Sequence, residues 1–218
     1  MNKIIRILVV DDHSLVRTGI KHMLDAEPGF SVVGEAVSGE EALELGKKLI
    51  PDVVLMDIKM PGIGGLEATS RLIRSIPEVK VLIVTVCTDN IFPSKLMQAG
   101  AFGYLTKGAS FKEMIRAIQT IYSGQRYISP DIASQLAIMH LTDNQEVPFE
   151  ILSERELQVA IMIVKGMKPS LISQKLHLSP KTINSYRYRI FDKLNIKNDV
   201  ELTHLAIKHN LLDESEAQ

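Results

Sequence analysis

The chain has 218 residues, of which 45% are hydrophobic and 23% charged, and its formal net charge is −1. This composition excludes a disordered protein, and the length allows one or two domains with cores of their own. The single cysteine, Cys87, cannot form an internal disulfide, no signal stretch opens the chain, and no apolar run reaches the roughly 18 residues of a membrane span. We therefore expect a cytoplasmic protein that makes no contact with a membrane.

Up to residue 123, short apolar runs alternate with segments that have the length and spacing of helices. The runs are rich in β-branched residues, which is typical of strands buried in a parallel sheet, and they lie at 6–10, 51–57, 79–85 and 101–107. The helices are expected at 14–27, 38–49, 66–75, 93–99 and 110–122. Three serines at helix starts are expected to act as N-caps, namely Ser14, Ser38 and Ser110.

Three carboxylates follow two of the expected strands. Asp11 and Asp12 come directly after the first strand, and Asp57 closes the run at 51–57. Because open α/β sheets bind ligands at the carboxyl ends of their strands, we expect the three acids to lie close together. Adjacent carboxylates repel one another unless a cation holds them, and a site of hard oxygen donors suits Mg²⁺. The alternative is that these three acids are turn residues at the ends of the strands and bind no ligand.

Two further polar residues end the next two strands. Thr85 closes the run at 79–85, and Lys107 closes the run at 101–107. A hydroxyl, an ammonium, Mg²⁺ and a spare carboxylate are the groups needed to hold a phosphoryl group. The carboxylate can itself be the nucleophile, which gives an aspartyl phosphate. Either residue alone says little, but the acid pair, Asp57, Thr85 and Lys107 in this order indicate a phosphoryl site.

The second half of the chain has a different pattern. Residues 124–150 are interpreted as a linker, in which residues 132–141 could form one amphipathic helix. From residue 151 to residue 218 the pattern is helical throughout. Ser153 and Glu156 form a capping-box sequence, and Ser179 followed by Pro180 is typical of a helix start. A short helix at 170–176, a tight turn and a helix at 179–194 predict a helix-turn-helix.

Charge is distributed unevenly along the chain. Residues 1–145 hold 15 Lys and Arg against 16 Asp and Glu, whereas residues 165–197 hold eight Lys and Arg against one acid, Asp192. A local excess of positive charge indicates a polyanionic partner. Combined with a helix-turn-helix, it predicts binding to double-stranded DNA.

The helix at 179–194 can be divided by its period. Ile183, Tyr186, Ile190 and Leu194 recur at three- and four-residue steps and are expected to face the core. Recognition helices place their N-terminal part against base edges, where an asparagine can pair with adenine. Basic residues beside this face are suited to phosphates. The expected DNA-contacting residues are Lys181, Thr182, Asn184, Ser185, Arg187, Tyr188, Arg189 and Lys193.

Residues 4–123 resemble the receiver domain of a bacterial two-component response regulator, and the motif Asp57-Ile-Lys-Met-Pro-Gly62 matches that family closely. The resemblance implies a flavodoxin-like (βα)₅ fold. It places the phospho-acceptor on Asp57, the Mg²⁺-binding acids on Asp11, Asp12 and Asp57, and the phosphoryl-contacting groups on Thr85 and Lys107. It also implies that Thr85 and Tyr104 act as switch residues and that a sensor histidine kinase supplies the phosphoryl group.

The second half is similar to LuxR/NarL-type helix-turn-helix domains, and residues 179–194 are closest to the GacA/UvrY/LetA group. The resemblance implies a transcription regulator, with an α/β receiver domain at 1–123, a linker at 124–150 and a small all-α DNA-binding domain at 151–218. Regulators of this group typically activate genes for small regulatory RNAs. Because helix-turn-helix proteins usually bind as two-fold dimers, we expect phosphorylation to promote a homodimer. The output is binding, so we do not expect an enzyme.

Two alternatives share parts of this pattern. A signalling adaptor whose C-terminal helices bind a protein would show an apolar stripe on the outward face of the helix at 179–194, where the residues are polar. A haloacid-type phosphatase also uses an aspartyl nucleophile, but it needs a second Asp two residues later, and that position is Lys59.

Overall fold

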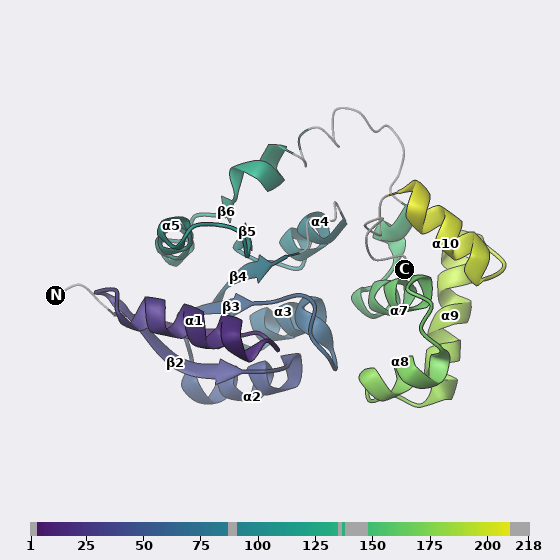
Figure 1. The fold of residues 1–218 in the computed structure, drawn as a ribbon, viewed down its shortest axis with the longest axis horizontal. Helices are drawn as coiled ribbons and strands as arrows, with labels where there is room; N and C mark the ends of the chain where they lie inside the picture. The colour runs from purple at the N-terminus through teal and green to yellow at the C-terminus, as the bar shows by residue number, and fades with distance from the viewer. Residues whose placement is uncertain (1–3, 87–90, 135–136, 138–147, 210–218) are drawn as a thin grey trace. The chain divides into compact units, whose positions relative to one another are not determined.

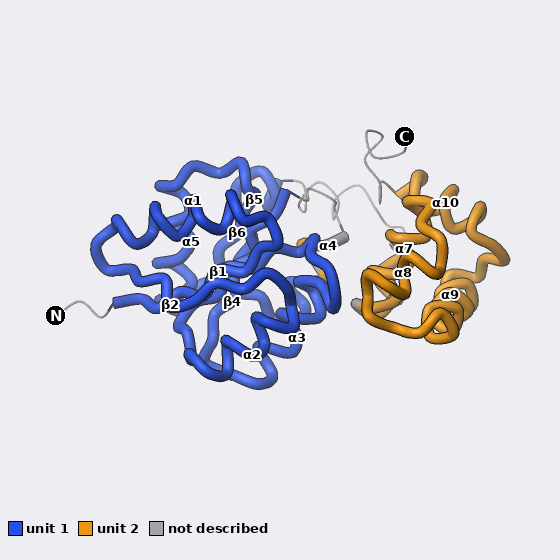
Figure 2. Tube along the Cα trace, turned by 60° about the horizontal axis from the view of Figure 1, so that its bottom comes forward, with its two compact units in different colours: residues 1–88, 96–135 blue, residues 89–95, 136–218 orange. Residues whose placement is uncertain are grey.

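The computed structural model of the chain describes residues 4–86, 91–134, 137 and 148–209. It forms two compact units (Figure 2), one of residues 1–88 and 96–135 and one of residues 89–95 and 136–218. The domain boundaries expected at residues 123 and 150 remain predictions. No helix among the described residues is long and apolar enough to cross a membrane.

The first unit is built on a parallel sheet in the order β2-β1-β3-β4-β5-β6. The strands are β1 (Ile5–Val10), β2 (Phe30–Ala36), β3 (Val53–Met56), β4 (Lys80–Thr85), β5 (Gly103–Thr106) and β6 (Tyr127–Ile128). The first five follow the flavodoxin-like order, which confirms the predicted fold. The short sixth strand pairs in parallel with β5 and lies in the segment that the sequence suggested to be linker.

The helices of this unit are α1 (Ser14–Asp25), α2 (Gly39–Leu49), α3 (Gly64–Ser75) and α5 (Phe111–Tyr122), together with the end of α4 (Ile91–Gln98), whose residues 91–95 are counted in the second unit. Leu24 of α1 and Ile118 of α5 share one core cluster with Ile7 and Val9 of β1, so these two helices cover the same face of the sheet (Figure 1). Side chains alternate along a strand, so Leu8 points to the opposite face, where α2 and α3 pack together.

Two of the three expected serine N-caps are present, and one helix begins earlier than expected. Ser38 and Ser110 accept hydrogen bonds from Glu41 and Glu113, as predicted for N-caps of α2 and α5. The prediction for Ser14 is wrong, because α1 begins at this residue and its N-cap is His13, whose side chain makes no capping hydrogen bond. Helix α3 begins at Gly64 rather than at residue 66, since two glycines in its first turn hide the helical period.

The second unit is helical among its described residues. It contains a 3₁₀ turn, η1 (Pro148–Ile151), and the helices α7 (Glu154–Val164), α8 (Pro169–Lys175), α9 (Pro180–Leu194) and α10 (Asp199–Lys208). The capping box of Ser153 and Glu156 and the N-cap of Ser179 are confirmed. Helix α8, the turn at His177 and helix α9 form the predicted helix-turn-helix, and His177 adopts a positive φ of 51° in that turn.

The possible linker helix at residues 132–141 lies largely outside the described residues. Its first turn is described, because the chain is helical from Pro130 to Ser134. Ser129 precedes this turn, and its carbonyl accepts a hydrogen bond from the backbone of Ala133 at 2.9 Å.

Candidate functional site

The carboxylate of Asp57 is buried at the carboxyl end of β3. Asp57 is 2% exposed, and its backbone N–H donates to the carbonyl of Val10 at 2.9 Å, which continues the pairing of β3 with β1. Its Oδ1 accepts a hydrogen bond from the backbone of Ile58 at 2.7 Å. Gly65 lies so close that a Cβ there would overlap the carbonyl oxygen of Asp57. The position therefore requires glycine, and the loop after β3 holds the carboxylate in one place.

A second group of donors follows β1. Asp11 is also 2% exposed, and its Oδ1 accepts from the backbone N–H of His13 at 2.8 Å. Asp12 is exposed, and the Nδ1 of His13 lies 2.9 Å from its Oδ1. Asp11, Asp12, His13 and Asp57 can each offer one ligand atom, and these atoms lie within 4.8 Å of one another. Three of the four donors are carboxylates, so the residues fit a divalent cation such as Mg²⁺.

Lys107 joins the two buried acids. Its Nζ lies 2.6 Å from Asp11 Oδ2 and 2.8 Å from Asp57 Oδ2. Burial lowers the pKa of the Lys107 ammonium, but the hydrogen bonds to Asp11 and Asp57 outweigh it and hold this pKa above its ordinary value. The side chain is therefore a fixed cation at the edge of the pocket, in a position to contact an anionic group bound to Asp57.

The two expected switch residues lie on the neighbouring strands. Thr85 is fully buried at the end of β4, and its carbonyl accepts from the backbone of Lys107 at 2.8 Å. Tyr104 is fully buried in β5, where it pairs with Ile83 of β4. The structure thus brings Asp11, Asp12, Asp57 and Lys107 together, with Thr85 joined to them through the backbone.

The outward face of α9 carries the polar residues that the sequence predicts to be there. Lys181, Asn184, Ser185 and Tyr188 are all exposed, and Tyr188 is 73% exposed. The Ser185 hydroxyl donates to the carbonyl of Lys181 at 3.0 Å. Ile183 and Ile190 are buried, while Tyr186 and Leu194 are half-buried, which is the predicted core side of the helix.

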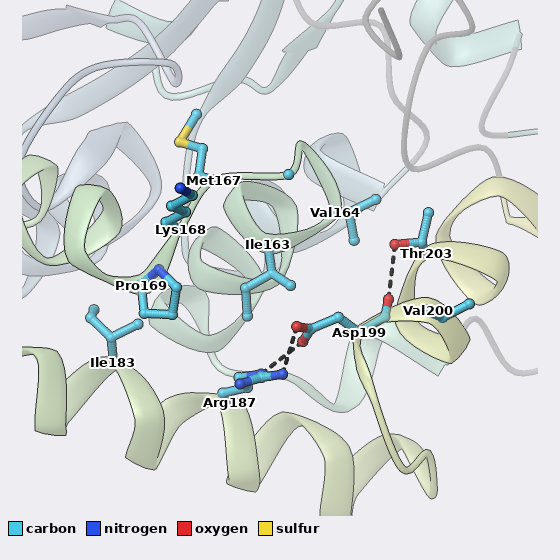
Figure 3. Close-up of a pocket in the computed structure, with 11 residues that line it drawn as sticks. Ile163, Val164, Met167, Lys168, Pro169, Ile183, Arg187, Asp199, Val200 and Thr203 are labelled. Atoms are coloured by element: carbon cyan, nitrogen blue, oxygen red, sulfur yellow. Dashed lines mark hydrogen bonds and ion pairs between the residues drawn. The ribbon is translucent and has the colours of Figure 1, made fainter.

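Two of the expected phosphate-contacting residues are held by acids within the unit. Arg187 donates through Nε to Asp199 Oδ1 at 2.7 Å and through a terminal nitrogen to Oδ2 at 2.6 Å. This pair ties α9 to α10 along a cavity of about 370 Å³ that apolar residues such as Ile163 and Val200 also line (Figure 3). The guanidinium of Arg187 is therefore already paired with the carboxylate of Asp199 and would have to serve both this carboxylate and a DNA phosphate.

Lys193 makes the other ion pair. Its Nζ lies 2.6 Å from Oε2 of Glu156, a residue of α7 that is 4% exposed. Burial raises the pKa of Glu156, but hydrogen bonds from Lys193 and Ser153 outweigh burial and hold this pKa below its ordinary value. Arg189, in contrast, is exposed, and its guanidinium carbon lies 5.9 Å from the ring of Tyr186.

Comparison with known proteins decides the family. Residues 7–119 match the model of the response regulator receiver domain, and residues 150–206 match the model of bacterial regulatory proteins of the luxR family. The chain belongs to the two-component response regulators. The match to the luxR family does not favour the alternative of a signalling adaptor whose C-terminal helices bind a protein.

Relatives of this response regulator cover nearly its whole length. It is 59% identical to response regulator GacA of Pseudomonas protegens over 211 residues, which are 97% of this chain and 99% of the relative. It is 57% identical to response regulator UvrY of Escherichia coli over 208 residues, which are 95% of each chain. These two names confirm the resemblance seen in the sequence of residues 179–194.

Two solved structures show the same fold. A LuxR-family response regulator from Aurantimonas has a TM-score of 0.62 and 39% identity, over 64% of this chain and 99% of that one. RcsB of Salmonella enterica, bound to a promoter with a phosphomimetic, has a TM-score of 0.67 and 22% identity, over 93% of this chain and 98% of its own. At that identity the second likeness concerns the fold alone.

Sequence reasoning missed three features of these sites in the response regulator. His13 joins the acidic cluster, although its position directly after Asp12 indicated no role for it. The partners of the two basic residues, Asp199 for Arg187 and Glu156 for Lys193, are also unexpected. Each pair joins different helices, and helical period alone does not predict which side chains meet between helices.

Proposed function

We propose that Asp57 is the phospho-acceptor of this response regulator, and that its phosphorylation by a sensor histidine kinase controls sequence-specific binding to double-stranded DNA and transcription. One observation carries this proposal. The buried carboxylate of Asp57 shares the ammonium of Lys107 with Asp11, at 2.8 Å and 2.6 Å, at the strand ends where α/β sheets bind ligands.

In the proposed reaction, a carboxylate oxygen of Asp57 attacks phosphorus. The new oxygen–phosphorus bond forms as the bond from phosphorus to the histidine nitrogen of the kinase breaks, and the released imidazole takes up a proton. Asp11, Asp12 and Asp57 would hold Mg²⁺, which when bound would offset the negative charge of the phosphoryl oxygens. Lys107 binds one of these oxygens, and the Thr85 hydroxyl donates a hydrogen bond to another.

The phosphoryl group then changes the local balance of charge. Lys107 contacts Asp11 as well as Asp57, so a phosphoryl group on Asp57 competes with Asp11 for the ammonium. Thr85 and Tyr104, on adjacent strands, carry the change to the surface of the domain. The proposed signal is thus the added negative charge at Asp57, which shifts the domain from one conformation toward another.

The proposed output site is the outward face of α9. Asn184 and Tyr188 are exposed near the start and middle of a helix-turn-helix recognition helix, with Lys181 and Ser185 beside them. They are suited to read base edges, while Arg189 is suited to phosphates. Thr182, Arg187 and Lys193 remain expected contacts, although the last two also hold acids within the unit.

The wider role follows from the family. We expect phosphorylation to promote a homodimer that binds two half-sites, as helix-turn-helix proteins usually do. By analogy with GacA and UvrY, the targets include genes for small regulatory RNAs, and the regulator works in the cytoplasm. Its output is binding, so we assign it no enzymatic activity of its own.

The experiment that tests the site is labelling with acetyl phosphate. Wild-type protein with Mg²⁺ should gain one phosphoryl group on Asp57, located by mass spectrometry, and labelled protein should bind promoter DNA more tightly in a gel-shift assay. Label on another residue, or labelling that needs no divalent cation, contradicts the assignment.

A further inference from the structure

The N-terminus of α3 is capped by a side chain from a different helix. Ile63, the N-cap residue of α3, has no side-chain acceptor of its own. Its backbone N–H donates instead to Oε1 of Glu40, a residue of the first turn of α2, at 3.0 Å. The same carboxylate lies against Gly62, whose φ is +75°, and a Cβ there would overlap both carboxylate oxygens. Glu40 therefore holds the chain just before α3 begins.

The loop that Glu40 holds begins at the phospho-acceptor. Residues 58–63 connect Asp57 to α3, and at the start of this loop the N–H of Ile58 donates to Asp57 Oδ1 at 2.7 Å. The carbonyl of Ile58 accepts from the backbone of Met60 at 3.1 Å and of Gly65 at 3.0 Å. Ile58 is thus hydrogen-bonded both to the Asp57 carboxylate and, through Gly65, to the first turn of α3, so a shift near Ile63 reaches Asp57.

We propose that Glu40 is a positioning residue for the phosphorylation of Asp57, a role that rests on the proposed function. The loop contains Gly62 at a positive φ, and such a segment samples several conformations unless a partner fixes it. A helix N-terminus also needs an acceptor for its first N–H groups, and Glu40 is the acceptor for Ile63. When the Glu40 carboxylate is removed, the loop can move, and the N–H of Ile58 no longer holds Asp57 Oδ1 in a single position.

The test compares three substitutions of Glu40 with a control on the same helix. Glu40→Ala removes the acceptor, and Glu40→Asp shortens its reach by one methylene, so both should slow labelling by acetyl phosphate and Mg²⁺ by about tenfold, as misplaced reacting groups do. Glu40→Gln keeps an oxygen that can accept from Ile63 and should label at the wild-type rate. Glu44→Ala, at an exposed position one turn further along α2, should also match wild type.

A second readout separates positioning from general loss of structure. Hydrogen exchange of the Ile58 amide, followed by NMR, should become faster in Glu40→Ala and Glu40→Asp, while amides in β1 and β3 keep their wild-type protection. Glu40→Gln should restore slow exchange at Ile58 together with the labelling rate. This joint rescue is what a purely structural role does not produce.

The outcomes that overturn the inference are distinct from those that overturn the phospho-acceptor. Wild-type labelling of Glu40→Ala, or labelling of Glu40→Gln as slow as that of Glu40→Ala, rejects the positioning role. Asp57→Asn is incubated with acetyl phosphate and Mg²⁺ in parallel. If that variant still gains a phosphoryl group, the proposed function fails, whereas an unlabelled Asp57→Asn beside a fully active Glu40→Ala rejects the role of Glu40 alone.

Discussion

The acidic cluster around Asp57 has two buried carboxylates, whereas the charged residues on the outward face of α9 are exposed to solvent. In the pocket, Asp11 and Asp57 are each 2% exposed and share one ammonium. On α9, Lys181 and Arg189 are exposed to solvent. Buried charges interact strongly and in one geometry, whereas exposed charges are screened by salt and tolerate movement. Substitutions in the pocket should therefore abolish function, while substitutions on the face of α9 should change it by degrees.

The largest expected effect is at Asp57. Asp57→Asn keeps the size of the side chain but replaces the nucleophilic oxygen by an amide, so uptake of a phosphoryl group from acetyl phosphate should stop completely. Intact-protein mass spectrometry measures this directly. Asp12→Asn is the informative companion, because the nucleophile remains and the variant should need a higher concentration of Mg²⁺ for labelling.

Lys107 should come next. Lys107→Ala removes a fixed cation from the phosphoryl oxygens, at a cost on the order of 2–4 kcal/mol for a preorganised electrostatic donor. We expect the variant to bind Mg²⁺ at least as well as wild type, since the ammonium no longer competes for Asp11 and Asp57, and yet to fail to activate transcription. Normal activation of a reporter gene by Lys107→Ala in cells would show that Lys107 is structural.

The ion pair between Lys193 of α9 and the buried Glu156 of α7 provides a test of stability. Lys193→Met leaves the carboxylate of Glu156 without its cation, and because Lys193 is partly exposed we expect a loss of about 1–3 kcal/mol, measured by hydrogen exchange of α7 and α9 amides in urea. The exposed control Arg189→Met should change stability by less than about 0.5 kcal/mol. Equal losses in both variants contradict a special role for the pair of Lys193 and Glu156.

The same pair predicts a dependence on pH. The pKa of Glu156 is lower in the folded protein than its ordinary value of 4.5, so the stability that the carboxylate contributes is present above the unfolded pKa. This stability is lost as pH falls through the folded pKa. The difference between wild type and Lys193→Met should therefore shrink below about pH 4.5.

Two substitutions on the exposed side of α9 should separate two kinds of DNA contact without affecting phosphorylation. Asn184→Ala should lose about 1–3 kcal/mol for the preferred sequence and little for other sequences, because a base contact is specific. Arg189→Ala should weaken binding to all sequences alike and flatten the dependence on salt concentration. Binding titrations at several salt concentrations measure both, and a uniform loss in Asn184→Ala would reject base readout.

The contrast between the two regions also explains what the sequence could predict. Asp11, Asp57, Thr85 and Lys107 end four buried strands, and a parallel sheet brings strand ends together whatever the details of packing. The exposed residues Lys181, Asn184 and Tyr188 follow from the helical period, with the core marked by Ile183 and Ile190. Both arguments depend on regular geometry.

Contacts between elements could not be predicted in this way. Glu40 caps α3 from another helix, and neither residue of this contact shows in the sequence that the other is its partner. Arg187 and Lys193 look like free cations in the sequence, because Asp199 and Glu156 lie on different helices. These features depend on side-chain packing between elements, which a one-dimensional pattern does not record.

The sixth strand has a practical consequence for anyone who wishes to handle the receiver domain alone. The backbone N–H groups of Tyr127 and Ser129 donate to the carbonyls of Phe102 and Tyr104 at 3.0 Å and 3.1 Å. A fragment that stops at residue 123 removes these donors and leaves β5 as a bare edge, which is a template for pairing with a second fragment. Such a truncation can dimerise or aggregate for reasons unrelated to signalling, and a fragment that extends past Pro130 avoids this artefact.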